Sequence, residues 1–589
     1  ADDVTTINIT GDQAVAIGNT RDSNVSGLST SNLTAGDEVT IDANEASAGV
    51  SVEIADEDRE HSVTGSAGDD SCTFDGVQFN DDDSVEGGDG KDSVTANGLS
   101  GNVGDVQLSN VESATFDVSG GATVGLVQTS GLETATFDVG NLDSKSTIED
   151  VGSETAVAIT DNTGTTGGGS TVTIEGQTGV SSLDLTLGSD ALGVRDGSDR
   201  AFTDQGADGN DGNALDLDDG TIALDDGFTE ATITVEGEGS AGGTGANNAS
   251  NGVDGSDGAG SIDQLDATGL TAATLVLSNG SNFTIDDLKA GDLETLTLEG
   301  GGATDTLTID NDGGDSDTGS LSTVDASGLG AGLTLGSDAN GAIELADGAS
   351  VTGGAASDTI FWNINTQNGV TLDAGNSGVG GDTLDLEGSQ NLGGGEIDLS
   401  ADDQVVRING AGNDTVQTGF ENVDASGAGG SNAINIDGNN ADNGITGTSN
   451  DDIITGGDGD DTLTGGGGAD VLTGGDGQDT FVFTDGDRPQ ASGVTADSSD
   501  LNDTDNGDAD RINLGNGVER ITDFAIGGDV LSTPSDLVID SIGDNIGSVN
   551  LVDNGVDLLR GNLDQQNDAF NLTTEGSDVL VAVGTTGGA

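Results

Sequence analysis

Aspartates recur at a fixed nine-residue spacing in the last third of the chain. Five consecutive units fit the same phase, at residues 438–446, 447–455, 456–464, 465–473 and 474–482. The last three match the pattern G-G-x-G-x-D-x-U-x, in which U is apolar, at every defined place. The first two units keep the spacing but lose glycines, and the first has Asn443 in place of the aspartate.

This pattern suits the chemistry of a bound Ca²⁺ ion. The ion takes about six to eight oxygen ligands, more than one short loop supplies, so stacked loops would share ions. Glycines allow a positive φ that turns carbonyl oxygens inward, and the sixth-place aspartate adds a charged ligand. The predicted metal-site residues are Asp452, Gly456, Gly457, Gly459, Asp461, Gly465, Gly466, Gly468, Asp470, Gly474, Gly475, Gly477 and Asp479.

The eighth place of each unit is apolar and follows the loop in a short predicted strand. Ile454, Leu463, Leu472 and Phe481 occupy this place and would form a narrow core. The alternative is a flexible Gly/Asp linker, but a linker does not need an apolar residue at every ninth place.

These residues resemble the calcium-binding nonapeptide of the RTX (repeats-in-toxin) family, which folds as a parallel β-roll. The resemblance implies export by type I secretion machinery, an unfolded state in the low-calcium cytoplasm and folding outside the cell. It also implies a C-terminal export signal, and residues 520–524 and 576–583 resemble the ends of such proteins. The chain begins Ala-Asp-Asp without a basic, apolar signal segment, which favours this route unless a signal was removed.

Single, degenerate copies of the nonapeptide lie upstream, at 65–73, 87–95, 300–308, 353–361 and 409–417, and only the copy at 87–95 satisfies the whole pattern. They predict dispersed calcium sites; the alternative is turns of a β-coil without metal. The candidate residues are Asp70, Gly88, Gly90, Asp92, Asp305, Asp358 and Asp414.

A longer period precedes these sites. Glu112, Glu133 and Glu154 follow one another at intervals of 21 with Thr, Ala and Val in similar places, which predicts one solenoid coil per repeat. Together with corner-like D-A-S/T-G segments, these runs resemble bacterial surface-layer proteins of the RTX type. Secreted adhesins share the same features.

The sequence therefore predicts an all-β protein, a parallel β-solenoid or β-roll with calcium-binding nonapeptide repeats and small β terminal modules. The predicted parts are an N-terminal β module at 1–60, a solenoid with scattered calcium loops at 61–430, the RTX β-roll at 431–484, and a C-terminal β module with the secretion signal at 485–589.

Composition excludes several partners. The chain has 108 acidic and 12 basic residues, a formal charge of -96, so it lacks the basic clusters that nucleic acids and anionic membranes require. No apolar stretch reaches the roughly 20 residues of a membrane span. Low hydrophobicity with high charge usually indicates disorder. Here many acids fall at the sixth place of nine-residue units, so we interpret them as a ligand set for Ca²⁺.

Catalytic chemistry has few candidates. His61 is the only histidine, which excludes a two-histidine zinc site, and we expect it to be solvated because it follows an acidic, polar stretch. Cys72, at the inward eighth place of its unit, predicts a small buried hydrophobe, and Trp362 predicts packing. We therefore expect no enzymatic activity.

The predicted function is that of a secreted, calcium-dependent structural protein at the extracellular cell surface, which self-assembles into a surface layer or filament. Its expected partners are further copies of itself, the type I secretion machinery and a cell-surface polysaccharide. Two alternatives stay open: an adhesin or matrix-binding protein, and a polysaccharide-modifying enzyme.

Overall fold

The structure of the protein is a computed structural model, which describes only part of the chain. The described residues are 6–17, 39–54, 60–74, 79–139, 145–160, 171–188, 216–224, 227–236, 260–278, 282–310, 320–336, 343, 345–363, 369–376, 378–387, 395–408, 411–412, 416–429, 433–482, 511–513, 520–521, 530–532, 538–542, 555–564, 569–572 and 578–583. The regular elements in these ranges are all β-strands. Within them, no helix is long and apolar enough to cross a membrane.

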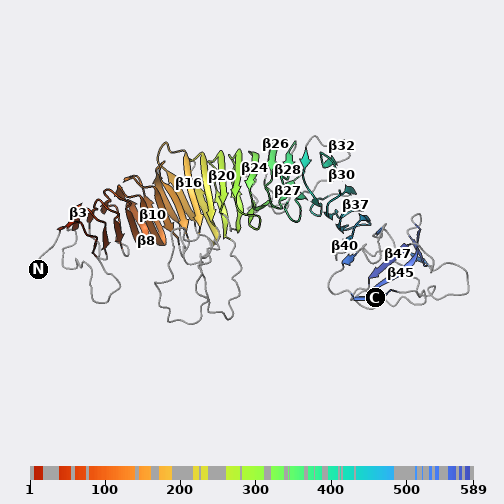
Figure 1. Ribbon diagram of the computed structural model, residues 1–589. Coiled ribbons are helices and arrows are strands. Elements are labelled where there is room, and N and C mark those ends of the chain that lie inside the picture. Colours follow the sequence, from red (N-terminus) through yellow and green to blue (C-terminus); the bar gives the residue numbers. More distant parts are fainter. Residues whose placement is uncertain are drawn as a thin grey trace, which may run out of the picture. The chain divides into compact units, whose positions relative to one another are not determined.

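The chain divides into two compact units, 1–360 and 361–589. The first unit is a parallel β-solenoid in which each strand pairs with its counterpart one coil later (Figure 1). The ladder that opens it contains β1 (Thr6–Gly11), β3 (Val39–Ala46), β5 (His61–Thr64), β7 (Ser84–Glu86), β9 (Gln107–Ser109) and β11 (Thr129–Ser130).

A second ladder runs along the whole first unit. It contains β2 (Val15–Ile17), β4 (Val50–Ile54), β6 (Ser71–Phe74), β8 (Ser93–Asp105), β10 (Ser113–Gly125), β12 (Thr134–Asp138), β14 (Ala156–Thr160), β16 (Ser182–Gly188), β18 (Glu230–Glu236), β20 (Ala272–Leu277), β22 (Thr295–Gly300), β24 (Leu321–Leu329) and β26 (Leu345–Thr352).

The long strand β10 joins this ladder to a third one, because its first half pairs with β12 and its second half with β13. The third ladder contains β13 (Ser146–Val151), β15 (Thr171–Gly176), β17 (Asp216–Leu224), β19 (Gly260–Asp266), β21 (Asn282–Lys289), β23 (Thr306–Ile309), β25 (Gly332–Leu335) and β27 (Thr359–Asn363).

The predicted coil period matches the strand register. Thr134 pairs with Ser113 before it and with Ala156 after it, so successive coils here take 21 and 22 residues. Alternate residues of each strand point inward, as β20 shows with its repeating half-buried and buried positions. The core is thin and built mainly from Val, Ile, Leu and Ala. One aromatic stack lies within it, with Phe74–Phe79 and Phe116–Phe137 ring centroids 4.6 and 4.9 Å apart.

The second unit contains the nonapeptide roll. One of its parallel ladders contains β29 (Thr383–Glu387), β34 (Asn422–Asp424), β36 (Gly444–Thr446), β38 (Thr462–Thr464), β40 (Thr480–Val482) and β43 (Val530–Ser532), beside the pair β28 (Thr371–Asp373) and β33 (Gln417–Thr418). The other sheet contains β32 (Ala411–Gly412), β31 (Val405–Ile408), β30 (Gly395–Asp398), β35 (Ile434–Asp437), β37 (Ile453–Asp458), β39 (Val471–Asp476) and β42 (Arg520–Ile521).

A separate sheet contains the last strands of the chain, β41 (Arg511–Asn513), β44 (Val538–Ile542), β45 (Gly555–Asp564), β46 (Ala569–Leu572) and β47 (Asp578–Val583). Its β45 pairs antiparallel with β46 and β47, in contrast to the parallel roll. The predicted all-β, parallel β-roll class is confirmed. The residue bounds of the four predicted parts stay predictions.

Candidate metal centre

Successive nonapeptides of the roll contribute strands to opposite sheets. Leu463 of β38 pairs with Phe481 of β40, and Ile454 of β37 pairs with Leu472 of β39, so one coil takes two units, or 18 residues. These four apolar side chains are fully buried between the sheets. The loops before the strands consequently stack in two columns, one at each edge of the roll.

Sixth-place side chains link the loops within each column. The Asp470 Oδ1 atom accepts a hydrogen bond from the Asp452 main-chain N–H at 2.7 Å. In the other column, Asp461 Oδ1 accepts from Asn443 N–H at 2.8 Å, and Asp479 Oδ1 accepts from Asp461 N–H at 3.1 Å. Each of these carboxylates therefore uses one oxygen to hold the coil before it, and all of these residues are buried.

The second-place and fourth-place glycines of the last three units are required by the backbone. Their φ angles lie between +93° at Gly466 and +150° at Gly477, a region that L side chains rarely adopt. Space is equally limiting, since a Cβ atom on Gly475 would lie 1.9 Å from the carbonyl oxygen of Gly457 in the preceding coil. The glycines thus permit both the turn and the close stacking of one loop on the next.

The Asp461 carboxylate has a buried oxygen that no protein group satisfies. Its Oδ2 atom has no hydrogen-bond partner, and the residue is 1% exposed. Burial, reinforced by the charges of Asp479, Asp442 and Asp460, raises the pKa of Asp461 to about 6. A Cβ on Gly456 would lie 2.1 Å from Oδ2, so this glycine leaves room beside the unsatisfied oxygen.

These features fit a bound hard cation. In the described ranges no three His, Cys, Asp or Glu side chains converge on one point, so main-chain carbonyl oxygens of the glycine loops must complete the ligand set. Asp461 and its counterparts Asp470 and Asp479 would supply the charged ligands. The ion would contribute positive charge that offsets the desolvation of these carboxylates and links one coil to the next.

The geometry defines a calcium-binding β-roll, and comparison with known families agrees. Residues 446–481 match the RTX calcium-binding nonapeptide repeat, in four copies. The chain therefore contains RTX-type calcium-binding repeats, which bind Ca²⁺ at multiple sites. No curated protein matches the chain.

A second row of hydrogen bonds, made by the fifth-place aspartates, also links successive coils of the roll. Sequence reasoning missed it. The fifth-place aspartates Asp442, Asp451 and Asp460 accept hydrogen bonds from the main-chain N–H of the fifth-place residue one coil later, at 2.7–2.8 Å. The repeat pattern leaves this place undefined. The recurring Asp-Asp pairs at places five and six were the available signal.

Several upstream candidates have carboxylates that accept main-chain hydrogen bonds at the start of a strand. Asp358 is 1% exposed and accepts from Leu333 N–H at 2.8 Å and from Gly354 N–H at 2.5 Å. Asp305 accepts from Gly302 N–H at 2.6 Å. These contacts account for their burial without a cation, and calcium at these two residues stays a prediction. Asp414 lies outside the described residues.

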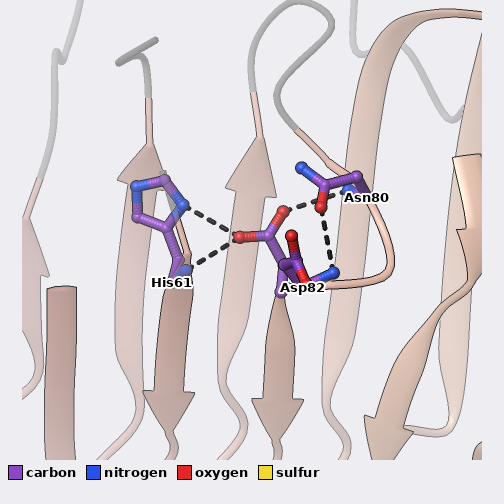
Figure 2. A network of polar contacts seen from close by, with 4 residues as sticks. His61, Asn80 and Asp82 are labelled. Carbon is purple, nitrogen blue, oxygen red and sulfur yellow. Dashed lines mark hydrogen bonds and ion pairs between the residues drawn. The ribbon is translucent and has the colours of Figure 1, made fainter. Parts of the chain in front are cut away.

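The prediction of a solvated His61 is wrong. His61 is 2% exposed, and its main-chain N–H and Nδ1 atom lie 2.8 and 3.0 Å from Oδ1 of the fully buried Asp83 (Figure 2). The register explains this placement, because Val39 pairs with His61 and both point into the core. Asn80 N–H donates to the other Asp83 oxygen at 3.0 Å and so fixes the carboxylate.

The two other singled-out side chains are placed as predicted. Cys72 is 4% exposed, and burial, together with the charge of Asp83, raises the pKa of its thiol, as in a small buried hydrophobe. Trp362 is 2% exposed and packs in the core of its unit.

Proposed function

We propose that the protein is a secreted structural protein that self-assembles at the cell surface, as a surface layer or a filament, and that Ca²⁺ triggers its folding and assembly. The observation that carries this proposal is the column of buried sixth-place carboxylates in the roll. Without a cation, Asp461 and Asp479 repel one another and each loses hydration. Ca²⁺ reverses this effect, so binding free energy becomes folding free energy.

Secretion is supported by the repeat family. Proteins with RTX repeats are typically exported by type I machinery, and a calcium-poor cytoplasm would leave the roll unfolded until export. The charge of -96 supports an extended chain before calcium binding, because like charges oppose compaction.

Self-assembly is supported by the architecture. The strands of a parallel solenoid pair only with the coils before and after them, so the two ends of a stack present backbone groups that a further strand can pair with. A second copy is a natural partner for such ends, and repeated end-to-end contacts give filaments or sheets.

A non-catalytic role is part of the proposal. The single histidine of the chain, His61, is buried against Asp83 and cannot reach a substrate on the surface. General acid–base chemistry would therefore depend on carboxylates alone. Turnover of a polysaccharide that is lost when one acidic pair is replaced would contradict this part.

Negative-stain electron microscopy of the full chain, in millimolar Ca²⁺ and in chelator, tests the proposal. We expect ordered layers or filaments only with Ca²⁺, and Asp461→Asn should weaken assembly more than Asp458→Asn, which removes the same charge from an exposed third place. Identical circular dichroism with and without Ca²⁺ would refute calcium-triggered folding. A saturable glycan or protein ligand without ordered polymers would instead support an adhesin.

A further inference from the structure

Two loops of the first unit, 65–70 and 87–92, stack on one another far outside the matched repeats. Asp89 N–H donates to the Ser66 carbonyl oxygen at 3.2 Å, and Lys91 N–H donates to Asp69 Oδ1 at 3.0 Å. The first bond joins the third place of one nonapeptide to the second place of the other. The second bond joins the fifth places of the two nonapeptides.

The roll contains the same bonds. Asp458 N–H donates to the Asn439 carbonyl oxygen at 3.0 Å, and Asp460 N–H donates to Asp442 Oδ1 at 2.7 Å. The upstream loops therefore stack in the manner of two consecutive loops in one column of the calcium-binding roll.

The glycine conformations also agree. Gly88 and Gly90 have φ angles of +109° and +136°, and their counterparts Gly457 and Gly459 have +123° each. A Cβ on Gly88 would lie 2.1 Å from the Ser66 carbonyl oxygen, so the loops approach as closely as those of the roll. Carbonyl oxygens of the upstream loop therefore follow the same path.

Asp92 has the same unsatisfied oxygen as Asp461. It is 3% exposed; its Oδ1 accepts from Asp70 N–H at 2.7 Å, whereas its Oδ2 has no partner. A Cβ on Gly87 would lie 2.4 Å from Oδ2, so the oxygen points into its own glycine loop. Burial with the nearby charges of Asp70 and Glu112 raises the pKa of Asp92 to about 6.

Asp92 also lines a small cavity. Gly65, Asp70, Gly87 and Asp92 line its polar side, and apolar core side chains such as Val52 line the rest. Residues of both loops therefore meet at this cavity.

We propose that loops 65–70 and 87–92 form a further divalent-cation site, which takes Ca²⁺ through Asp92 Oδ2 and main-chain carbonyl oxygens of the two loops. The site joins two coils of the first unit, so Ca²⁺ stabilises the solenoid as well as the roll. Asp358 differs, because main-chain N–H groups already occupy both of its oxygens. This inference does not depend on self-assembly.

Hydrogen exchange of the full chain, read by mass spectrometry in Ca²⁺ and in chelator, tests the site locally. We expect exchange in peptides from 65–93 to slow roughly tenfold or more with Ca²⁺. Asp92→Asn should remove this effect and leave the calcium response of 446–481 intact. Asp89→Asn is the matched control, since it removes the same charge at an exposed third place and should change neither response.

A wild-type protein in which Ca²⁺ protects 446–481 but leaves 65–93 unchanged would overturn the proposal. Equal loss of the 65–93 response in Asp92→Asn and Asp89→Asn would also overturn it, because net charge would then be the cause. The wild-type comparison decides by itself, so the test stands even where Asp92→Asn fails to fold. A failure of calcium-triggered folding would appear separately, as an absent response in 446–481.

Discussion

The substitution Gly475→Ala should uncouple the last calcium loop from the roll. Gly475 has a φ of +111°, where an L residue is strained by about 1–2 kcal/mol or more. The new Cβ would lie 1.9 Å from Gly457 O, whereas ordinary contact begins near 3.4 Å. The two coils would have to separate by about 1.5 Å, against a normal strand spacing of about 4.8 Å.

Separation of this size costs more than strain alone. Overpacking in a rigid core typically costs about 1–3 kcal/mol, so the total is about 2–5 kcal/mol. A loss of about 3 kcal/mol lowers the folding equilibrium constant by more than a hundredfold, at about 1.4 kcal/mol per factor of ten. If about four ions bind cooperatively on folding, the calcium midpoint rises roughly threefold to fourfold.

Circular dichroism during a calcium titration measures this midpoint. Gly467→Ala is the matched control, because Gly467 lies at the undefined third place of the neighbouring loop and has no positive φ. We expect its midpoint to stay near that of the wild type. Equal midpoints for the two alanine variants would refute the argument that the second-place glycine permits coil stacking.

Further predictions concern charge and polarity. The pKa of Asp461 without metal is raised from 3.8 to about 6, so the folding stability of the metal-free roll should fall as pH rises through about 4–6. Protons compete with Ca²⁺ for the carboxylate, so calcium affinity should weaken about tenfold per pH unit below 6. Equal affinities at pH 5 and pH 7.5 in calorimetry would contradict this. Asp83→Asn should destabilise the first unit by about 1–3 kcal/mol in thermal melts, because it removes the charge that holds the buried His61; an unchanged melting temperature would count against it. Asn443→Asp should make the stability of the first nonapeptide of the roll calcium-dependent, because the new carboxylate loses the hydrogen bond that Asn443 Nδ2 donates to the Glu421 carbonyl oxygen at 2.7 Å. Hydrogen exchange of this nonapeptide in chelator should become faster in Asn443→Asp and stay unchanged in the exposed control Asn435→Asp.

The nine-residue period made the roll predictable because it sets both the inward side chain and the stacking of the loops. Residues at the eighth place had to face a common core, and Leu463 and Leu472 do so. The partners of Asp83 could not be predicted in the same way. The carboxylate meets His61 across 22 residues, and that contact follows only from the length of one particular coil, which varies along the first unit.

The sixth-place aspartates are alike in sequence but differ in the structure, and in four loops the difference follows the residue at the second place. Where that residue is Thr448 or Ser66, its N–H and hydroxyl both donate to Oδ2 of Asp452 or Asp70. In the loops of Asp461 and Asp92 that residue is a glycine, which has no hydroxyl, and Oδ2 has no partner.

In these four loops a hydroxyl at the second place competes with the cation for Oδ2, whereas the glycines of the Asp461 and Asp92 loops leave that oxygen available. Here the second place therefore does more than permit a backbone turn: it separates carboxylates that the protein itself satisfies from carboxylates that an ion would satisfy. By this reasoning Asp461 and Asp92 should bind Ca²⁺ more tightly than Asp452 and Asp70, although all four occupy the same place in the repeat.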